Sequence, residues 1–136
     1  MEEIAYVAGL FDGEGCVMMT QRPDRSWQLE LQLSNCDVRL LEFMVATFGG
    51  KYRIATVGRN ERRYPCGVWC ISGQGAEKAA RAMMKYSIAK KEQLRLFLKA
   101  RATVVERGQR ISSGTHKRRR LIAKEIRQLK RPQVAA

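Results

Sequence analysis

Acidic residues are scarce in this chain of 136 residues. It has 13 Asp and Glu against 26 Lys and Arg, which leaves a formal net charge of +13 and a pI near 10.2. The imbalance is strongest at the C-terminal end, where residues 101–136 hold 11 basic and 2 acidic side chains. An ordinary neutral domain is excluded, and polyanionic partners are favoured, with nucleic acid as the first candidate and an anionic membrane surface as the second.

Long apolar runs are also absent. None approaches the roughly 18 to 20 residues of a membrane span, and Glu2 and Glu3 stand where a signal peptide would carry positive charge. We therefore expect a soluble intracellular protein with no membrane partner. Because 45% of the residues are hydrophobic, the chain has enough apolar mass for one packed core.

Histidine and cysteine are few. The single histidine, His116, lies in the basic C-terminal segment and is interpreted as a surface residue. No Ser/His/Asp set and no nucleotide-binding glycine loop is present, and no small-molecule substrate is expected. A structural zinc site needs four ligands, and the cysteines supply one close pair with no histidine nearby, so reduced thiols are expected at Cys16, Cys36, Cys66 and Cys70.

The order of elements predicts an α+β fold with one mostly antiparallel sheet under helices. Apolar residues at helical spacing predict helices over 3–11, 38–48, 76–86, from 90 onward and over 118–130. Extended segments predict two hairpins, with strands over 16–20, 27–34, 51–57 and 66–72. In the second strand Leu29, Leu31 and Leu33 alternate with polar residues, so one face is expected to be buried and the other to be a row of hydrogen-bonding side chains.

The segment Asp12-Gly13-Glu14-Gly15 places two carboxylates two residues apart at a helix end. Acidic groups are unfavourable there because the C-terminal end of the helix dipole is already negative. Two interpretations are open: a divalent cation, for which Mg²⁺ suits the hard oxygen ligands, or a solvated turn.

Residues 6–17, with the nonapeptide VAGLFDGEG, resemble the signature of the LAGLIDADG homing endonucleases. Lys90-Lys91-Glu92-Gln93 at the start of a late helix is similar to the lysine-glutamine segment of that family. The resemblance covers 1–105 and implies the αββαββα endonuclease core, in which the sheet is a DNA-binding saddle and the helices lie on its other face. It leaves 106–136 as a basic C-terminal extension, expected to be partly helical.

The resemblance also implies roles for residues of the motif. A single signature implies a homodimer through the first helix, with Ala5, Ala8, Gly9 and Asp12 at the crossing. Glu14 would bind Mg²⁺ together with the carbonyl of Gly13, although the family more commonly has Asp at that position, and Asp12 matches the acid that finishes the helix. The residues implied in catalysis are Glu14, Lys90, Asn35 and Arg39.

The family uses its sheet in the major groove, where alternate side chains of a β-ribbon reach base edges. Strand residues should specify bases, and residues at the hairpin tips are as well suited to phosphates. The DNA-binding candidates are Gln21, Arg22, Arg25, Gln28, Glu30, Gln32, Lys51, Arg53, Arg59, Arg62 and Arg63.

The expected function is a site-specific double-strand DNA endonuclease that cleaves a long pseudo-palindromic target with Mg²⁺. The main alternative is a non-cleaving binder of the same fold, either an intron RNA-splicing maturase or a DNA-binding regulator. A third alternative is a basic RNA-binding structural protein in which the motif is coincidental.

Overall fold

The computed structural model describes residues 2–57, 64–104 and 109–131. Its elements follow the order helix, hairpin, helix, hairpin and then helices, which confirms the predicted α+β plan. They are α1 (Glu2–Glu14), β1 (Gly15–Gln21), β2 (Trp27–Asn35), α2 (Val38–Phe48), β3 (Lys51–Val57), β4 (Tyr64–Ser72), α3 (Gly73–Met84), α4 (Lys91–Arg101) and α5 (Ser113–Leu129).

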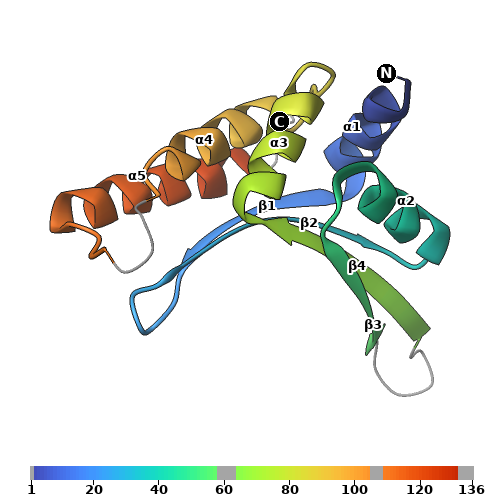
Figure 1. The fold of residues 1–136 in the computed structure, drawn as a ribbon, viewed down its shortest axis with the longest axis horizontal. Helices are drawn as coiled ribbons and strands as arrows, with labels where there is room; N and C mark the ends of the chain where they lie inside the picture. Colours follow the sequence, from blue (N-terminus) through green and yellow to red (C-terminus); the bar gives the residue numbers. More distant parts are fainter. Residues whose placement is uncertain (1, 58–63, 105–108, 132–136) are drawn as a thin grey trace.

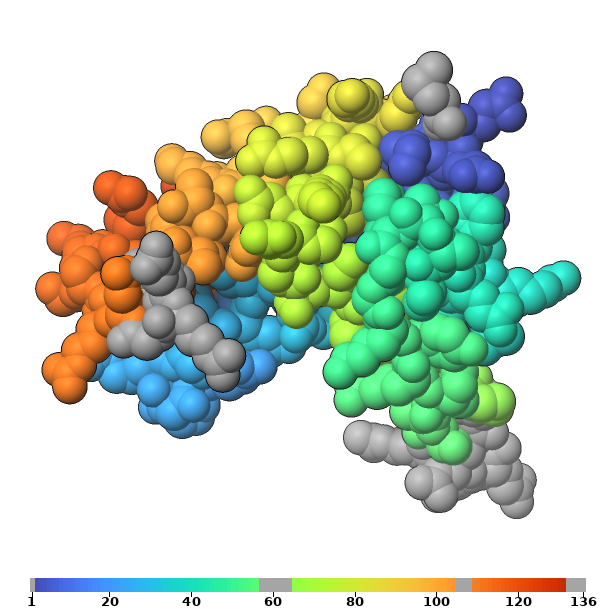
Figure 2. Space-filling view, in the orientation of Figure 1, coloured from blue at the N-terminus to red at the C-terminus, as the bar shows by residue number. Residues whose placement is uncertain are grey.

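The four strands form one antiparallel sheet in the order β1-β2-β4-β3. The two hairpins are thus joined through their inner strands, with Leu31 opposite Ile71. The helices gather on one side of the sheet, and the hairpins diverge on the other side (Figure 1). In the space-filling view this second side is hollowed between the hairpins (Figure 2).

The core lies between the sheet and the helices. Leu29, Leu31 and Leu33 of β2 are buried, as their alternation predicts, and they pack in one hydrophobic cluster with Phe11 and Trp69. The polar residues between the leucines therefore face away from the helices. We call this helix-free side of the sheet the open face.

The first helix is longer than the expected range of 3–11 and runs without a break to Glu14. Gly13 does not stop it, because the carbonyl of Asp12 in the last turn accepts a hydrogen bond from Lys90. The chain then enters β1 at Gly15, against which the ring of Phe11 packs so closely that any Cβ there would collide with it. The helix end and the sheet are thereby held in fixed relation.

The last helix begins at Ser113, earlier than expected, because the Ser112 hydroxyl caps it by accepting a hydrogen bond from the Thr115 amide at 3.1 Å. Ile122 and Ile126 of this helix belong to the same core cluster as the sheet. The boundary predicted at 105/106 lies outside the described residues.

His116 was predicted at the surface, and this prediction is wrong. It is buried in the first turn of α5, where its Nδ1 accepts a hydrogen bond from the Trp27 indole at 3.1 Å. The sequence does not show this contact, because its partner lies 89 residues earlier. Among the described helices, none is long and apolar enough to cross a membrane.

Candidate active site and nucleic-acid interface

Glu14 ends α1 at the point where the helix meets the sheet, and its side chain is exposed. The Asn35 side-chain amide, at the end of β2, donates a hydrogen bond to the Glu14 carboxylate. The side-chain oxygen of Asn35, Oδ1, in turn accepts a hydrogen bond from the Asp37 backbone amide at 2.7 Å. The structure thus brings together two of the predicted catalytic residues and orients the carboxylate of one through the other.

Asp12 points away from Glu14 and joins α1 to the start of α4. Its carboxylate accepts hydrogen bonds from the Ser87 hydroxyl and from the backbone amides of Ile88 (2.7 Å), Ala89 (3.2 Å) and Lys90 (3.2 Å). Burial raises the pKa of Asp12, but the bonds from Ser87 and the three amides outweigh it, so this pKa lies below its ordinary value. Asp12 is therefore a structural carboxylate.

Lys90 lies at the same helix end. It is the residue immediately before α4, and its Nζ donates to the backbone carbonyl of Asp12 at 2.8 Å. Lys91, the other lysine of the segment, is exposed. The ammonium group of Lys90 is therefore held at the Asp12 carbonyl, two residues before Glu14 along α1.

Arg39 is bound elsewhere. Its guanidinium donates to the carboxylate of Asp37 through Nε at 3.0 Å and through a terminal nitrogen at 2.7 Å. This Arg39 hydrogen bond lowers the pKa of Asp37 to about 2. No bond joins Arg39 to Glu14 or Asn35 in the part of the chain that the structure describes, and its side chain is 86% exposed. Arg39 is thus connected to the site only through Asp37, whose backbone amide is bound to Asn35.

The oxygen donors at this helix end suit a hard cation, but one chain supplies few of them. Gly13 has a carbonyl in the last turn of α1, and Glu14 has a carboxylate. Within residues 2–57, 64–104 and 109–131, no group of three or more His, Cys, Asp or Glu could hold a metal ion.

Thiols adjoin the carboxylate. The pKa of Cys36 is raised, first by a hydrogen bond with Cys66, then by desolvation and by the negative charges of Cys66 and Glu14. All four cysteines are free. The Cys36 thiol is therefore protonated near neutral pH and adds no charge to the site.

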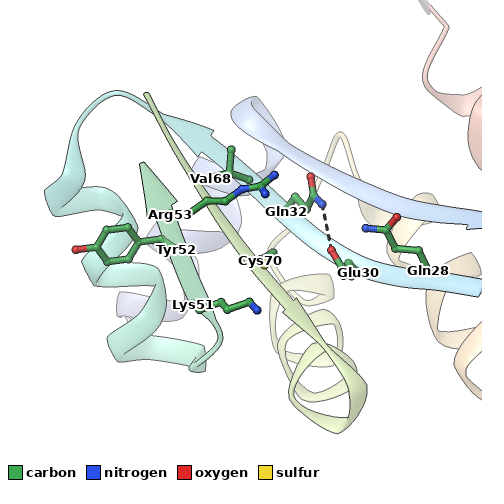
Figure 3. A pocket seen from close by; sticks show the side chains of 8 residues that line it. All are labelled: Gln28, Glu30, Gln32, Lys51, Tyr52, Arg53, Val68 and Cys70. Atoms are coloured by element: carbon green, nitrogen blue, oxygen red, sulfur yellow. Dashed lines mark hydrogen bonds between the residues drawn. The ribbon is translucent and has the colours of Figure 1, made fainter. Parts of the chain in front are cut away.

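The open face presents the polar row of β2. A shallow hollow of about 340 Å³ is lined by residues of β2, β3 and β4, which lie around it in Figure 3: Gln28, Glu30, Gln32, Lys51, Tyr52, Arg53, Val68 and Cys70. Five of the predicted DNA-binding residues thus share one surface. On one side of the hollow, β3 presents the hydrogen-bond donors Lys51 and Arg53. On the other side, β2 presents the amides of Gln28 and Gln32 and the carboxylate of Glu30.

The hairpin tips are less uniform. Arg22 and Arg25 are exposed in the β1–β2 turn, whereas Arg59, Arg62 and Arg63 lie outside the described residues. The prediction for Gln21 needs correction. Its side chain faces α5, where it contacts His116 Nδ1 at 3.3 Å and accepts from Arg120 at 3.4 Å. Strand alternation explains this, because Thr20 rather than Gln21 shares the face of Gln28.

The outer side of α1 carries small residues. Ala5 and Gly9 are exposed, and a Cβ at Gly9 would meet no atom within 4 Å. Ala8 is fully buried in the core of its own subunit. The Asp12 carboxylate accepts a hydrogen bond from the Lys90 amide, just before α4. Of the four residues predicted at the helix crossing, only Ala5 and Gly9 are therefore open to a second chain.

Sequence reasoning missed several residues. Ser87 binds Asp12 although 75 positions separate them, and no local pattern indicates it. Thr20 lies on the open face opposite Gln28, with its hydroxyl 3.4 Å from the Gln28 amide oxygen. The register of the first hairpin would have found Thr20, because cross-strand partners point to the same side.

Comparison with known proteins finds solved structures with a similar fold. No protein-family model and no curated protein sequence matches the chain. The archaeal intron-encoded homing endonuclease I-Vdi141I, solved in complex with DNA, is 16% identical with a TM-score of 0.76, covering 98% of this chain and 87% of its own. The homing endonuclease I-CvuI, solved in complex with its target, is 17% identical with a TM-score of 0.72. The match covers 99% of this chain and 86% of I-CvuI. The LAGLIDADG meganuclease I-AabMI, bound to uncleaved DNA, is 22% identical with a TM-score of 0.57 over 73% of this chain and 35% of its own.

The chain has the fold of the LAGLIDADG homing endonucleases. The similarity reaches beyond the signature, because the alignment with I-CvuI takes in nearly the whole chain, α5 included. This chain matches about a third of I-AabMI but most of I-CvuI and I-Vdi141I. The LAGLIDADG fold thus accounts for the α+β architecture and for the open face of the sheet.

Proposed function

We propose that the chain is a site-specific DNA endonuclease that acts as a homodimer and requires a divalent cation. The observation that carries the proposal is the end of α1: Glu14 is exposed there and oriented by Asn35, and Lys90 is fastened to the same turn. A protein that only bound nucleic acid would not need a carboxylate aimed toward phosphates.

The open face supports DNA as the substrate. It is a helix-free sheet face whose two hairpins diverge around a hollow, in a chain of net charge +13 (Figure 2). The major groove admits a β-ribbon, and alternate residues of β2 and β3 would reach base edges. The neighbours of the same fold, I-Vdi141I and I-CvuI, are solved in complex with DNA.

The cation would be held by the Glu14 carboxylate and the Gly13 carbonyl, with the same groups of a second subunit beside them. These are oxygen ligands of the kind that Mg²⁺ prefers. When bound, the cation would supply charge neutralisation at the scissile phosphate and at the leaving oxygen. I-CvuI was studied with Mg and with Ca.

The residues of the chain have separate tasks in phosphodiester hydrolysis. Water attacks the phosphorus in line, the bond from phosphorus to the 3′ oxygen breaks, and that oxygen takes up a proton. Lys90 uses one of its three ammonium protons on the Asp12 carbonyl, which leaves two to stabilise the negative charge that develops on the phosphoryl oxygens. Asn35 fixes the orientation of Glu14.

The outer side of α1 supports the proposed homodimer. Ala5 and Gly9 present no bulky side chain there, so a second backbone could approach closely. Two-fold symmetry would place one Glu14 near each strand of the duplex and would match a pseudo-palindromic target.

The test is a cleavage screen with the full chain. A plasmid library that carries candidate insertion-site sequences is incubated with the protein and Mg²⁺, and linear products are sequenced. We expect double-strand cuts at one sequence with two-fold character. Specific binding to a site without nicks in either strand of any plasmid would instead support the alternative, a non-cleaving binder such as a maturase or a regulator.

A further inference from the structure

The carboxylate of Glu30 is an anomaly on the open face. Glu30 is central in β2, where it pairs with Met18 of β1 and with Ser72 of β4. Its side chain points into the hollow that Lys51 and Arg53 border from β3 (Figure 3). A negative group at this position opposes the approach of phosphate.

No basic side chain neutralises it. Among the described residues, no Lys or Arg nitrogen lies within 4.0 Å of the Glu30 carboxylate, whereas Asp37, Glu77 and Glu92 all have arginine partners. The bond made by Glu30 is to Gln32, whose Nε2 donates to it at 3.1 Å. Glu30 is thus held in place by an amide rather than by a basic side chain.

The hydrogen-bonded pair of Glu30 and Gln32 presents hydrogen-bond acceptors to the hollow. An ionised carboxylate only accepts, and the amide of Gln32 spends one of its two donor hydrogens on Glu30. The opposite side of the hollow differs, because Lys51 and Arg53 only donate. The two sides therefore suit different base edges.

In the major groove, the donors are the exocyclic amino groups of cytosine and adenine. Adenine places its N7 acceptor beside that amino group, which would repel a carboxylate, whereas cytosine offers N4 without a neighbouring acceptor on the same base. We propose that Glu30, held by Gln32, reads the N4 amino group of a cytosine in the target. This assignment rests on the proposed function, since it concerns the DNA that the open face binds.

The experiment is a binding selection from randomised duplexes, with the full chain as wild type, Glu30→Gln and Glu42→Gln. Glu42→Gln is the matched control, because it makes the same charge change on the exposed side of α2, among the helices. Wild type and the control should enrich cytosine at one position of each half-site. Glu30→Gln should lower that preference roughly 5- to 150-fold and shift it toward adenine, since an amide pairs with adenine N6 and N7.

The outcomes separate the two claims. If wild type enriches a sequence and Glu30→Gln enriches the same bases at every position, the assignment of Glu30 is wrong while site-specific binding stands. If wild type enriches no sequence at all, both the proposed function and the assignment are wrong. A loss of preference confined to one position per half-site in Glu30→Gln, and absent from Glu42→Gln, supports the assignment.

Discussion

Asp12 and Glu14 are two residues apart, yet the structure gives their carboxylates different surroundings. Asp12 accepts four hydrogen bonds at the start of α4, and Glu14 is exposed with one partner, Asn35. A carboxylate whose oxygens are fully engaged has little capacity for a cation or a water molecule. The chemistry is therefore expected at Glu14 and the stability at Asp12.

Replacement of Asp12 by Asn should destabilise the fold. The charged acceptor of the backbone amides of Ile88, Ala89 and Lys90, just before α4, is lost, which costs about 1 to 3 kcal/mol for bonds to a charged group. Because the pKa of Asp12 is lowered in the folded state, its contribution is present above the unfolded pKa near 3.9 and is lost as the pH falls through the folded value. Urea unfolding at neutral pH and at about pH 3 measures both effects.

The control for this experiment is Glu125→Gln, which removes an exposed carboxylate of α5. Its unfolding midpoint at neutral pH should stay close to that of the wild type. If Asp12→Asn were as stable as Glu125→Gln, the bonds from Ser87 and the three amides before α4 would not contribute as described.

At the scale of elements, the sequence predicted what depends on local pattern. The bounds of α2 were predicted exactly as observed because its signals are local: Asp37 caps the first turn and Gly49 ends the helix in a left-handed conformation with φ 86°. The alternation in β2 likewise located the open face and three of the residues that line its hollow, Gln28, Glu30 and Gln32.

What the sequence could not predict depends on contacts between distant segments. The end of α1 was placed too early because the bond from Lys90 to Asp12 spans 78 positions. Gln21 and His116 were both assigned to the surface, yet they contact each other between β1 and α5. In the candidate site, Asn35 binds Glu14 across 21 positions, whereas Arg39 binds Asp37, two positions away.

The packing of α5 on the first hairpin predicts a pH-dependent stability. Burial lowers the pKa of His116, and the positive charges of Arg25, Arg120 and Arg119 lower it further. The unfolded chain then binds a proton more readily than the folded one, so stability falls as the pH drops below the unfolded pKa near 6.5, until the folded value is reached. The thermal midpoint should thus be lower at about pH 5.5 than at about pH 7.5.

His116→Gln isolates this effect, because the chain has no other histidine. The variant should show a smaller difference between the two midpoints, even though its own stability at the higher pH is reduced by the lost contact with Trp27. Equal differences in wild type and variant would mean that His116 titrates alike in the folded and unfolded states.

For the whole molecule, the central question is whether two copies associate through α1. Gly9→Leu tests the crossing of the first helices, since the side chain has room within one subunit but would separate two backbones in contact. The subunit should stay folded, and its dimer dissociation constant should rise at least about tenfold. Sedimentation equilibrium measures this, with Gly114→Leu in α5 as a control at another exposed helical glycine.

A monomeric wild type, or a Gly9→Leu variant that dimerises as tightly as the control, would contradict association through α1. The net charge of +13 also affects association of the two chains. Two such chains repel each other at low salt, so association at the helix crossing must outweigh that repulsion, and DNA would favour it by supplying negative charge.

The claim that Glu14 makes this fold an endonuclease is tested most directly by cleavage of a bound target. Wild type, Glu14→Gln and the control Glu42→Gln are compared on one duplex with Mg²⁺, and binding and cutting are measured on the same samples. We expect Glu14→Gln to bind within about threefold of the wild type and to cut at least about a hundredfold more slowly, while Glu42→Gln does both normally. Cutting by Glu14→Gln at the wild-type rate would contradict the account.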